Sequence, residues 1–383
     1  MMKKYTCRER VRTALNHLEP DQVPCDITIT PDAYARLCKH LGTDLEPRDW
    51  DDWNHVFPSP EVLEKLGVDV YHLPLKMSPA GFNIHLEEFR DQWGILKRKV
   101  HGEGGSIMYN MVDAPLRDAG TVADILNYKW PKPEELIDVS GMVEMTKNLY
   151  DNTKFALTAT FGGNIFERAH YLRGMENFFM DLLADEEMAG AVMDKILEIQ
   201  MKVDQIILSA IGRYLTYFRF NGEDMGSQNA PLISIDLFQR LVRPRLETEW
   251  KAASAEFRKH NPDGKIAIHS CGAVFDFIPL YIEMGADILN PVQPNARGMN
   301  TALIKKLYGD RICFHGGIDT QTVLANGTID QVREEVRVRI RDLAPSGGYI
   351  VAPSHNIQHG MSPENIVAMY DAVREFGKYG KIN

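Results

Sequence analysis

The sequence predicts an α/β fold of the (β/α)8 TIM-barrel type, with an N-terminal helical segment and a small β-rich insertion. Short apolar runs of strand length alternate with longer segments of helical periodicity, which is typical of a parallel sheet covered by helices. The chain is also 383 residues long, a length that suits a barrel with additional elements. We therefore expect a single barrel domain over residues 1–383.

The expected strands are short apolar runs bounded by turn residues. Six of them follow residue 150, and the earlier ones bring the total to a number that favours a closed barrel over an open sheet. Between residues 330 and 343, apolar residues recur at spacings of three and four, which predicts a helix. The expected strands are Val23–Thr28, Val68–Leu73, Phe155–Phe161, Tyr217–Asn221, Lys265–Ile268, Ala286–Pro291, Ile312–His315 and Tyr349–Ala352.

The stretch from about residue 85 to residue 130 has a different pattern. Asp91–Gly94 and the glycine turn Gly102–Gly105 precede the apolar run Ile107–Val112. Short strands around a glycine turn indicate antiparallel β-structure. We expect an inserted β-rich subdomain here, ending near Trp130–Pro133.

The composition restricts the class of protein. The formal net charge of −10 argues against nucleic acid or an anionic membrane as the main partner. No apolar run reaches the roughly 20 residues that span a bilayer, and the first residues lack the apolar core of a signal peptide. Five cysteines at scattered spacings do not indicate a disulfide framework. We therefore expect a cytoplasmic protein whose cysteines are buried or bind a metal.

Polar side chains follow the apolar strands directly in five places. All strands of a parallel barrel end at one face, where barrel active sites lie. We expect acid–base or substrate-orienting groups here, although helix or turn capping is an alternative for Glu223, Asp224 and Asp319. The candidates are Glu223, Asp224, His315 and Asp319 for catalysis, and Asn221, Asn290 and Gln293 for substrate binding.

A histidine and a cysteine two residues apart, His269 and Cys271, end one of these strands. An imidazole nitrogen and a thiolate together favour zinc among the abundant metals. His355, at the end of the last expected strand, is the candidate for a third ligand. Glu223 or Asp224 could complete the set, or a water molecule or the substrate could take the fourth position. The alternative is that His269 only caps its strand and Cys271 packs beside Gly272.

Several motifs resemble the uroporphyrinogen decarboxylase superfamily over nearly the whole chain. They include Arg8–Leu15 with Pro20–Pro24, Gly222–Gln228, His269–Gly272, Asn290–Gln293, Gly316–Asp319 and Ala352–His355. The decarboxylase itself carries an N-terminal Arg-Gln-Ala-Gly-Arg stretch that binds the carboxylates of its substrate. The corresponding region Ile27–Tyr34 has no arginine, so the resemblance favours another branch.

The branch that the chain resembles more is the cobalamin-dependent methyltransferases. Thiol-methylating members carry His-x-Cys and a later second cysteine as zinc ligands. This chain matches the first two at His269 and Cys271, and has His355 in the place of the third. Members that demethylate aromatic ethers carry Glu-x14-Glu-x20-His. The spacing of Asp319, Glu334 and His355 is the same, with Asp for the first Glu.

The resemblance implies a zinc-dependent methyltransferase that moves a methyl group from a small methylated substrate, such as a methoxylated aromatic, to a corrinoid protein. Its cofactors would be Zn²⁺ and a corrinoid (cobalamin) carried by that partner. A homodimer is left open. The alternatives are a metal-independent decarboxylase of the uroporphyrinogen decarboxylase type and a protein that only binds a corrinoid or a methylated ligand.

Overall fold

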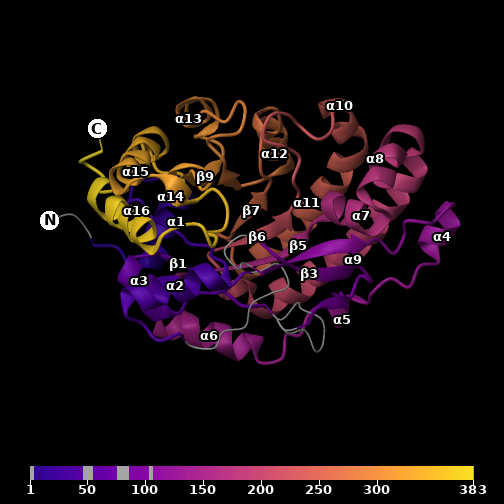
Figure 1. Cartoon of the computed structure of the whole chain (residues 1–383), viewed down its shortest axis with the longest axis horizontal. Coiled ribbons are helices and arrows are strands. Elements are labelled where there is room, and N and C mark those ends of the chain that lie inside the picture. Colours follow the sequence, from indigo (N-terminus) through magenta and orange to yellow (C-terminus); the bar gives the residue numbers. More distant parts are fainter. Residues whose placement is uncertain (1–3, 46–54, 76–85, 103–106, 383) are drawn as a thin grey trace.

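The computed structural model describes residues 4–45, 55–75, 86–102 and 107–382. Its largest sheet has seven parallel strands in the order β1-β5-β6-β7-β8-β9-β10. These strands lie in the middle of the molecule and helices lie around them (Figure 1). Six of the expected strands after residue 150 and the expected strand at 68–73 are therefore confirmed. The strands are β1 (Val70–His72), β5 (Ala156–Gly163), β6 (Tyr217–Gly222), β7 (Lys265–His269), β8 (Ile288–Val292), β9 (Cys313–Ile318) and β10 (Tyr349–Pro353).

The seven-stranded sheet is curled, because one residue from every strand meets in a single small core cluster. Val11 and Leu15 of α1 (Cys7–Leu15) complete this cluster, and α1 contacts β1, β5 and β10. Most of the strand residues are the first of their strands, so α1 fills the amino ends of the curled sheet. They are Val70, Ala156, Tyr217, Ala267, Ile288, Cys313 and Ile350.

The expected strand at 23–28 is not a regular strand, but it lies between the two edge strands of the sheet. Cys25 forms an isolated parallel bridge with Val351 of β10, and its carbonyl oxygen accepts a hydrogen bond of 3.0 Å from the amide of Asp69, just before β1. Pro24 has no amide hydrogen to donate, which limits the regular ladder that this segment can form. The segment carries Asp26 into the centre of the molecule, where its side chain is fully buried.

A second sheet lies in the stretch for which an insertion is expected. It has three antiparallel strands, β2 (Glu88–Arg90), β3 (Leu96–His101) and β4 (Ile107–Asp113). Most of the expected glycine turn lies outside the described residues. Trp93 connects this sheet to α7 (Ile165–Arg173), since the guanidinium of Arg168 lies 4.4 Å from the centre of its ring. The eighth strand expected for a closed barrel is not among the regular strands of the described residues.

The helices cover the outer surface of the parallel strands with their apolar faces. In α15 (Ile329–Leu343) the buried residues Val332, Val336, Ile340 and Leu343 recur at helical spacing, as the sequence predicts. Among the described residues, no helix is both long enough and apolar enough to cross a membrane. The other helices are α2 (Pro31–Leu41), α3 (Pro60–Leu66), α4 (Val122–Leu126), α5 (Pro133–Leu136), α6 (Met142–Asn152), α7 (Ile165–Arg173), α8 (Met175–Ala184), α9 (Glu186–Ile211), α10 (Ile235–Leu237), α11 (Arg243–His260), α12 (Ile278–Met284), α13 (Thr301–Tyr308), α14 (Val323–Asn326), α15 (Ile329–Leu343) and α16 (Pro363–Phe376).

Two buried carboxyl groups lie close to the end of β5, where the chain passes into α7. Asp204 of α9 and Glu249 of α11 are at most 1% exposed, and Glu249 accepts a hydrogen bond of 2.8 Å from the amide of Gly163. Burial raises the pKa of both carboxyls well above the usual value, and the charge of Asp204 adds to the effect on Glu249. Folding therefore favours the protonated form of these two carboxyls.

We expect the Asp204→Asn variant to have a weaker dependence of stability on pH than the native protein. A carboxyl whose pKa is raised by folding stabilises less as the pH rises from about 4, where the unfolded chain ionises, to the folded pKa. The native protein should lose about 1.4 kcal/mol per pH unit and per proton across this window. Urea unfolding between pH 5 and 8 measures the slope. Asp310→Asn, at a side chain that is 82% exposed, is the control, and equal slopes for all three proteins would contradict the expectation.

Candidate metal centre and cavity

A cavity of about 300 Å³ lies at the carboxyl ends of the parallel strands. The polar residues that end or follow β6, β7, β8 and β10 line it, as the sequence predicts for a barrel. Trp93 and Leu136 line it from outside the seven-stranded sheet. The polar residues of the strands and of the segments after them that form its wall include His72, Asn221, Asp224, His269, Asn290, His315 and His355.

Three side chains at this end form a group that can hold a metal ion. One donor atom each of Asp224, His269 and Cys271 lies within 4.8 Å of the other two. The Cys271 sulfur is 3.3 Å from Nε2 of His269, and Oδ1 of Asp224 is 3.8 Å from the same nitrogen. Asp224 is held in place because Oδ1 accepts a hydrogen bond of 2.7 Å from the Cys271 amide. The sequence thus indicates two members of this group, His269 and Cys271, as metal ligands. It indicates Asp224 as one candidate for a further ligand.

The electrostatics of this group favour a cation. Burial lowers the pKa of His269 to about 4, so its ring is neutral and can donate a lone pair at neutral pH. Burial also raises the pKa of Cys271 well above its usual value, and the nearby carboxylates of Asp224 and Glu167 raise it further. A metal ion bound between Asp224 and Cys271 would lower the pKa of this thiol again and favour its thiolate form.

His355 lines the same cavity but does not belong to this group of three donors. Burial lowers its pKa, so this ring too is neutral. Ligation by His355 therefore stays a prediction, and the structure groups Asp224 with His269 and Cys271.

Glu223, the neighbour of Asp224, points away from the cavity. Its carboxylate accepts hydrogen bonds from the backbone amides of Ile165, Phe166 and Glu167, the last two at 3.0 and 3.4 Å. These amides are the first of α7, where a helix has no internal acceptors for them. Glu223 is 4% exposed. The structure therefore gives it a role in fixing α7 rather than contact with a substrate.

Asn290 lies between several of the predicted site residues. Its side-chain oxygen is 2.6 Å from Nδ1 of His269, and its nitrogen is 2.6 Å from Nδ1 of His315. Asn221 also lines the cavity and donates a hydrogen bond of 2.9 Å to the carbonyl oxygen of Gly162. Gln293 instead accepts a hydrogen bond of 2.9 Å from the amide of Gly272, and thus supports the loop that carries Cys271.

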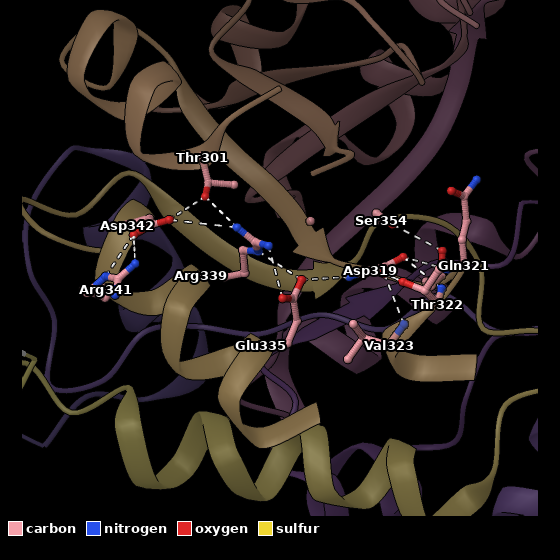
Figure 2. A network of polar contacts seen from close by, with 12 residues as sticks. Thr301, Asp319, Gln321, Thr322, Val323, Glu335, Arg339, Arg341, Asp342 and Ser354 are labelled. Carbon is pink, nitrogen blue, oxygen red and sulfur yellow. Dashed lines mark hydrogen bonds and ion pairs between the residues drawn. The ribbon is translucent and has the colours of Figure 1, made fainter. Parts of the chain in front are cut away.

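Asp319 is used within the turn that precedes α14 (Figure 2). Its carboxylate accepts hydrogen bonds from the amides of Gln321, Thr322 and Val323, at 2.8, 3.2 and 3.1 Å. This is the capping alternative that the sequence left open. Glu334, the middle residue of the second zinc pattern, pairs with Arg337 on the surface, so Asp319, Glu334 and His355 do not converge.

Sequence reasoning missed Glu167, Arg168, Arg219 and Asp26. The first three line the cavity. Burial and the charge of Asp224 raise the pKa of Glu167 to about 7, and the hydroxyl of Tyr171 donates a hydrogen bond to its Oε1. Charged residues inside apolar runs, such as Arg219 between Phe218 and Phe220, were the available signal.

Comparisons with known proteins agree with the fold and the family. The model of the family described as Uroporphyrinogen decarboxylase (URO-D) matches residues 109–376. Two curated proteins named uroporphyrinogen decarboxylase are similar over short stretches. The one from Thioalkalivibrio sulfidiphilus is 28% identical over 79 residues, or 21% of this chain and 22% of that protein. The one from Pseudoalteromonas translucida is 30% identical over 84 residues, or 22% of this chain and 23% of that protein. The chain thus spans under a quarter of the length of these relatives.

A solved structure resembles the whole chain. The methyltransferase from Methanosarcina mazei superimposes with a TM-score of 0.66 at 17% sequence identity, over 97% of this chain and 99% of that one. At this identity the likeness shows a common fold. The family model matches well over half of the sequence, and the chain belongs to the uroporphyrinogen decarboxylase family.

Proposed function

We propose that this protein is a zinc-dependent methyltransferase that moves a methyl group from a small methylated substrate to a corrinoid protein. The observation that carries the proposal is the group of Asp224, His269 and Cys271, of which Asp224 and His269 line the cavity. The fold shared with the methyltransferase from Methanosarcina mazei supports it.

The donor set fits zinc by its chemistry. A nitrogen, a sulfur and a carboxylate oxygen are common zinc ligands, and catalytic zinc sites combine three protein ligands with an open position. Under the proposal, His269 Nε2, Cys271 Sγ and a carboxylate oxygen of Asp224 hold the ion. Zinc bound there would supply a Lewis acid next to the leaving oxygen, nitrogen or sulfur of the methylated substrate.

The residues of the cavity would then bind and orient that substrate. Trp93 and Phe220 line the cavity and would give it apolar wall area for the substrate. The corrinoid of the partner protein would supply the acceptor of the methyl group, and the substrate heteroatom would keep the electron pair of its broken bond to the methyl carbon. Glu167 can give its proton to that heteroatom, because its pKa of about 7 leaves it partly protonated at neutral pH.

The proposal is tested by metal analysis together with a methyl-transfer assay. We expect about one zinc per chain, and loss of transfer from a methoxylated aromatic to a corrinoid protein on chelation, restored by added zinc. The variant Glu334→Gln should retain both zinc and activity, because this exposed side chain pairs only with Arg337 among the residues that the structure describes. Protein without bound zinc, or transfer that survives chelation, would overturn the proposal.

The decarboxylase alternative has one observation in its favour. Three cationic side chains, Lys97, Arg168 and Arg219, line the cavity and could bind substrate carboxylates. The same assay separates the two functions. Release of carbon dioxide from a polycarboxylate, without zinc and without a corrinoid, would favour decarboxylation.

A further inference from the structure

A continuous row of polar side chains leads from the metal-binding group into the centre of the molecule. It runs from His269 through Asn290 and His315 to Asp26, with contacts of 2.6, 2.6 and 2.8 Å. Asn290, His315 and Asp26 are at most 4% exposed. Buried polar groups need partners, and each of these three has them on two sides.

The orientation of the Asn290 amide is fixed by Arg219. The guanidinium of Arg219 lies 3.1 Å from Oδ1 of Asn290, and a guanidinium can only donate. The atom that faces it is therefore the amide oxygen. The same oxygen lies 2.6 Å from Nδ1 of His269, so this nitrogen must carry a hydrogen.

The other side of Asn290 fixes His315 in the same way. The amide nitrogen can only donate, so Nδ1 of His315 accepts, and the hydrogen of this neutral ring lies on Nε2. Nε2 then donates to Oδ2 of Asp26 at 2.8 Å. A carboxylate can only accept, and Asp26 also lies 2.9 Å from Nε2 of His72. Burial lowers the pKa of His315, which agrees with a neutral ring.

We propose that Asn290 is a positioning residue that holds His269 in the Nδ1–H tautomer, so that Nε2 faces Cys271 and Asp224 as the metal-binding atom. Asp26 fixes the donor and acceptor of each hydrogen bond in this row, because it can only accept a hydrogen bond from Nε2 of His315. This inference rests on the proposed function, since it assumes that His269 binds a metal. Partners of this kind orient ligating histidines and raise their basicity.

The tautomer is tested directly by nitrogen-15 NMR of the metal-free protein with labelled histidine, the His269→Gln variant serving for assignment. We expect a protonated Nδ1 and an unprotonated Nε2 for His269. A hydrogen on Nε2 would overturn the inference. This readout does not depend on metal binding, so it remains decisive even if the native protein binds no zinc and the proposed function fails.

The effect on the metal is measured by competition between the protein and a chelator for Zn²⁺, and for Co²⁺ as a spectroscopic probe. Asn290→Leu should weaken binding about 10- to 100-fold and change the Co²⁺ absorption spectrum. Asn290→Asp should stay within about threefold of the native protein, because it keeps an acceptor for the Nδ1 hydrogen.

A buried asparagine elsewhere separates positioning from a loss of stability. Asn261 donates a hydrogen bond of 2.7 Å to the carbonyl oxygen of Leu215 and does not line the cavity. Asn261→Leu should lower the unfolding temperature but leave metal affinity unchanged. If the native protein binds Zn²⁺ and the Asn290→Leu variant binds it with equal affinity, the positioning role of Asn290 is refuted. The proposed function would still stand in that case.

Discussion

Replacing His269 by alanine should remove bound zinc and reduce methyl transfer by roughly 1,000-fold or more. The physical reason is the small number of donors. Only Asp224 and Cys271 would remain of the group of three, and burial raises the pKa of the Cys271 thiol unless a cation compensates. A Lewis acid contributes several kcal/mol to such a reaction, and each 1.4 kcal/mol is about tenfold in rate.

The measurement is metal content and single-turnover methyl transfer on the same preparation. His359→Ala is the matched control, because His359 pairs with Asp32 at 2.7 Å and does not line the cavity. Cys271→Ser should also lower the zinc content and the rate of methyl transfer, because a serine oxygen is a poorer zinc ligand than a thiolate. A His269→Ala protein with full zinc content and native turnover would show that the group does not hold the catalytic metal.

The Glu223→Ala variant should be destabilised by about 3 to 5 kcal/mol. The change removes the acceptor of three backbone amides at the start of α7 and leaves them buried without a partner. Helix α7 carries Glu167 and Arg168 on the wall of the cavity, so its displacement should also weaken substrate binding.

Urea unfolding measures this change, and Glu223→Gln is the control within the same site. Glutamine keeps one oxygen for the amides of α7 but brings an NH2 group against the others, so we expect an intermediate loss. A Glu223→Ala protein within 1 kcal/mol of the native one would contradict the role of Glu223 in fixing α7.

Much of the fold could be predicted because most of the parallel strands correspond to a short apolar run that can be recognised from neighbouring residues alone. The apolar run Lys265–Ile268, for example, corresponds to β7 at Lys265–His269. The segment 23–28 is equally apolar, but its pairing depends on partners far away in the chain, such as Val351, and on Pro24. Only tertiary structure decides whether such a segment becomes a regular strand.

The candidate site could be predicted only where its residues follow strands. Glu223 and Asp224 are adjacent, and nothing in the sequence favours either over the other as a metal ligand. Successive side chains of an extended segment point in opposite directions, which sends Glu223 to α7 and Asp224 to the cavity. Asp26 and Glu167 reach the site from segments that lie far from β7 in sequence, so no spacing rule could have found them.

Helix α1 also has a consequence for the kinetics of the proposed reaction. Because it fills the amino ends of the strands, the described residues leave the carboxyl ends as the side from which reactants would reach the cavity. Under the proposed function, a small methylated donor and a whole corrinoid protein would use the same entrance. The donor would then enter first, and its demethylated product would leave after the larger partner has withdrawn. An excess of the corrinoid protein should therefore slow turnover rather than saturate it.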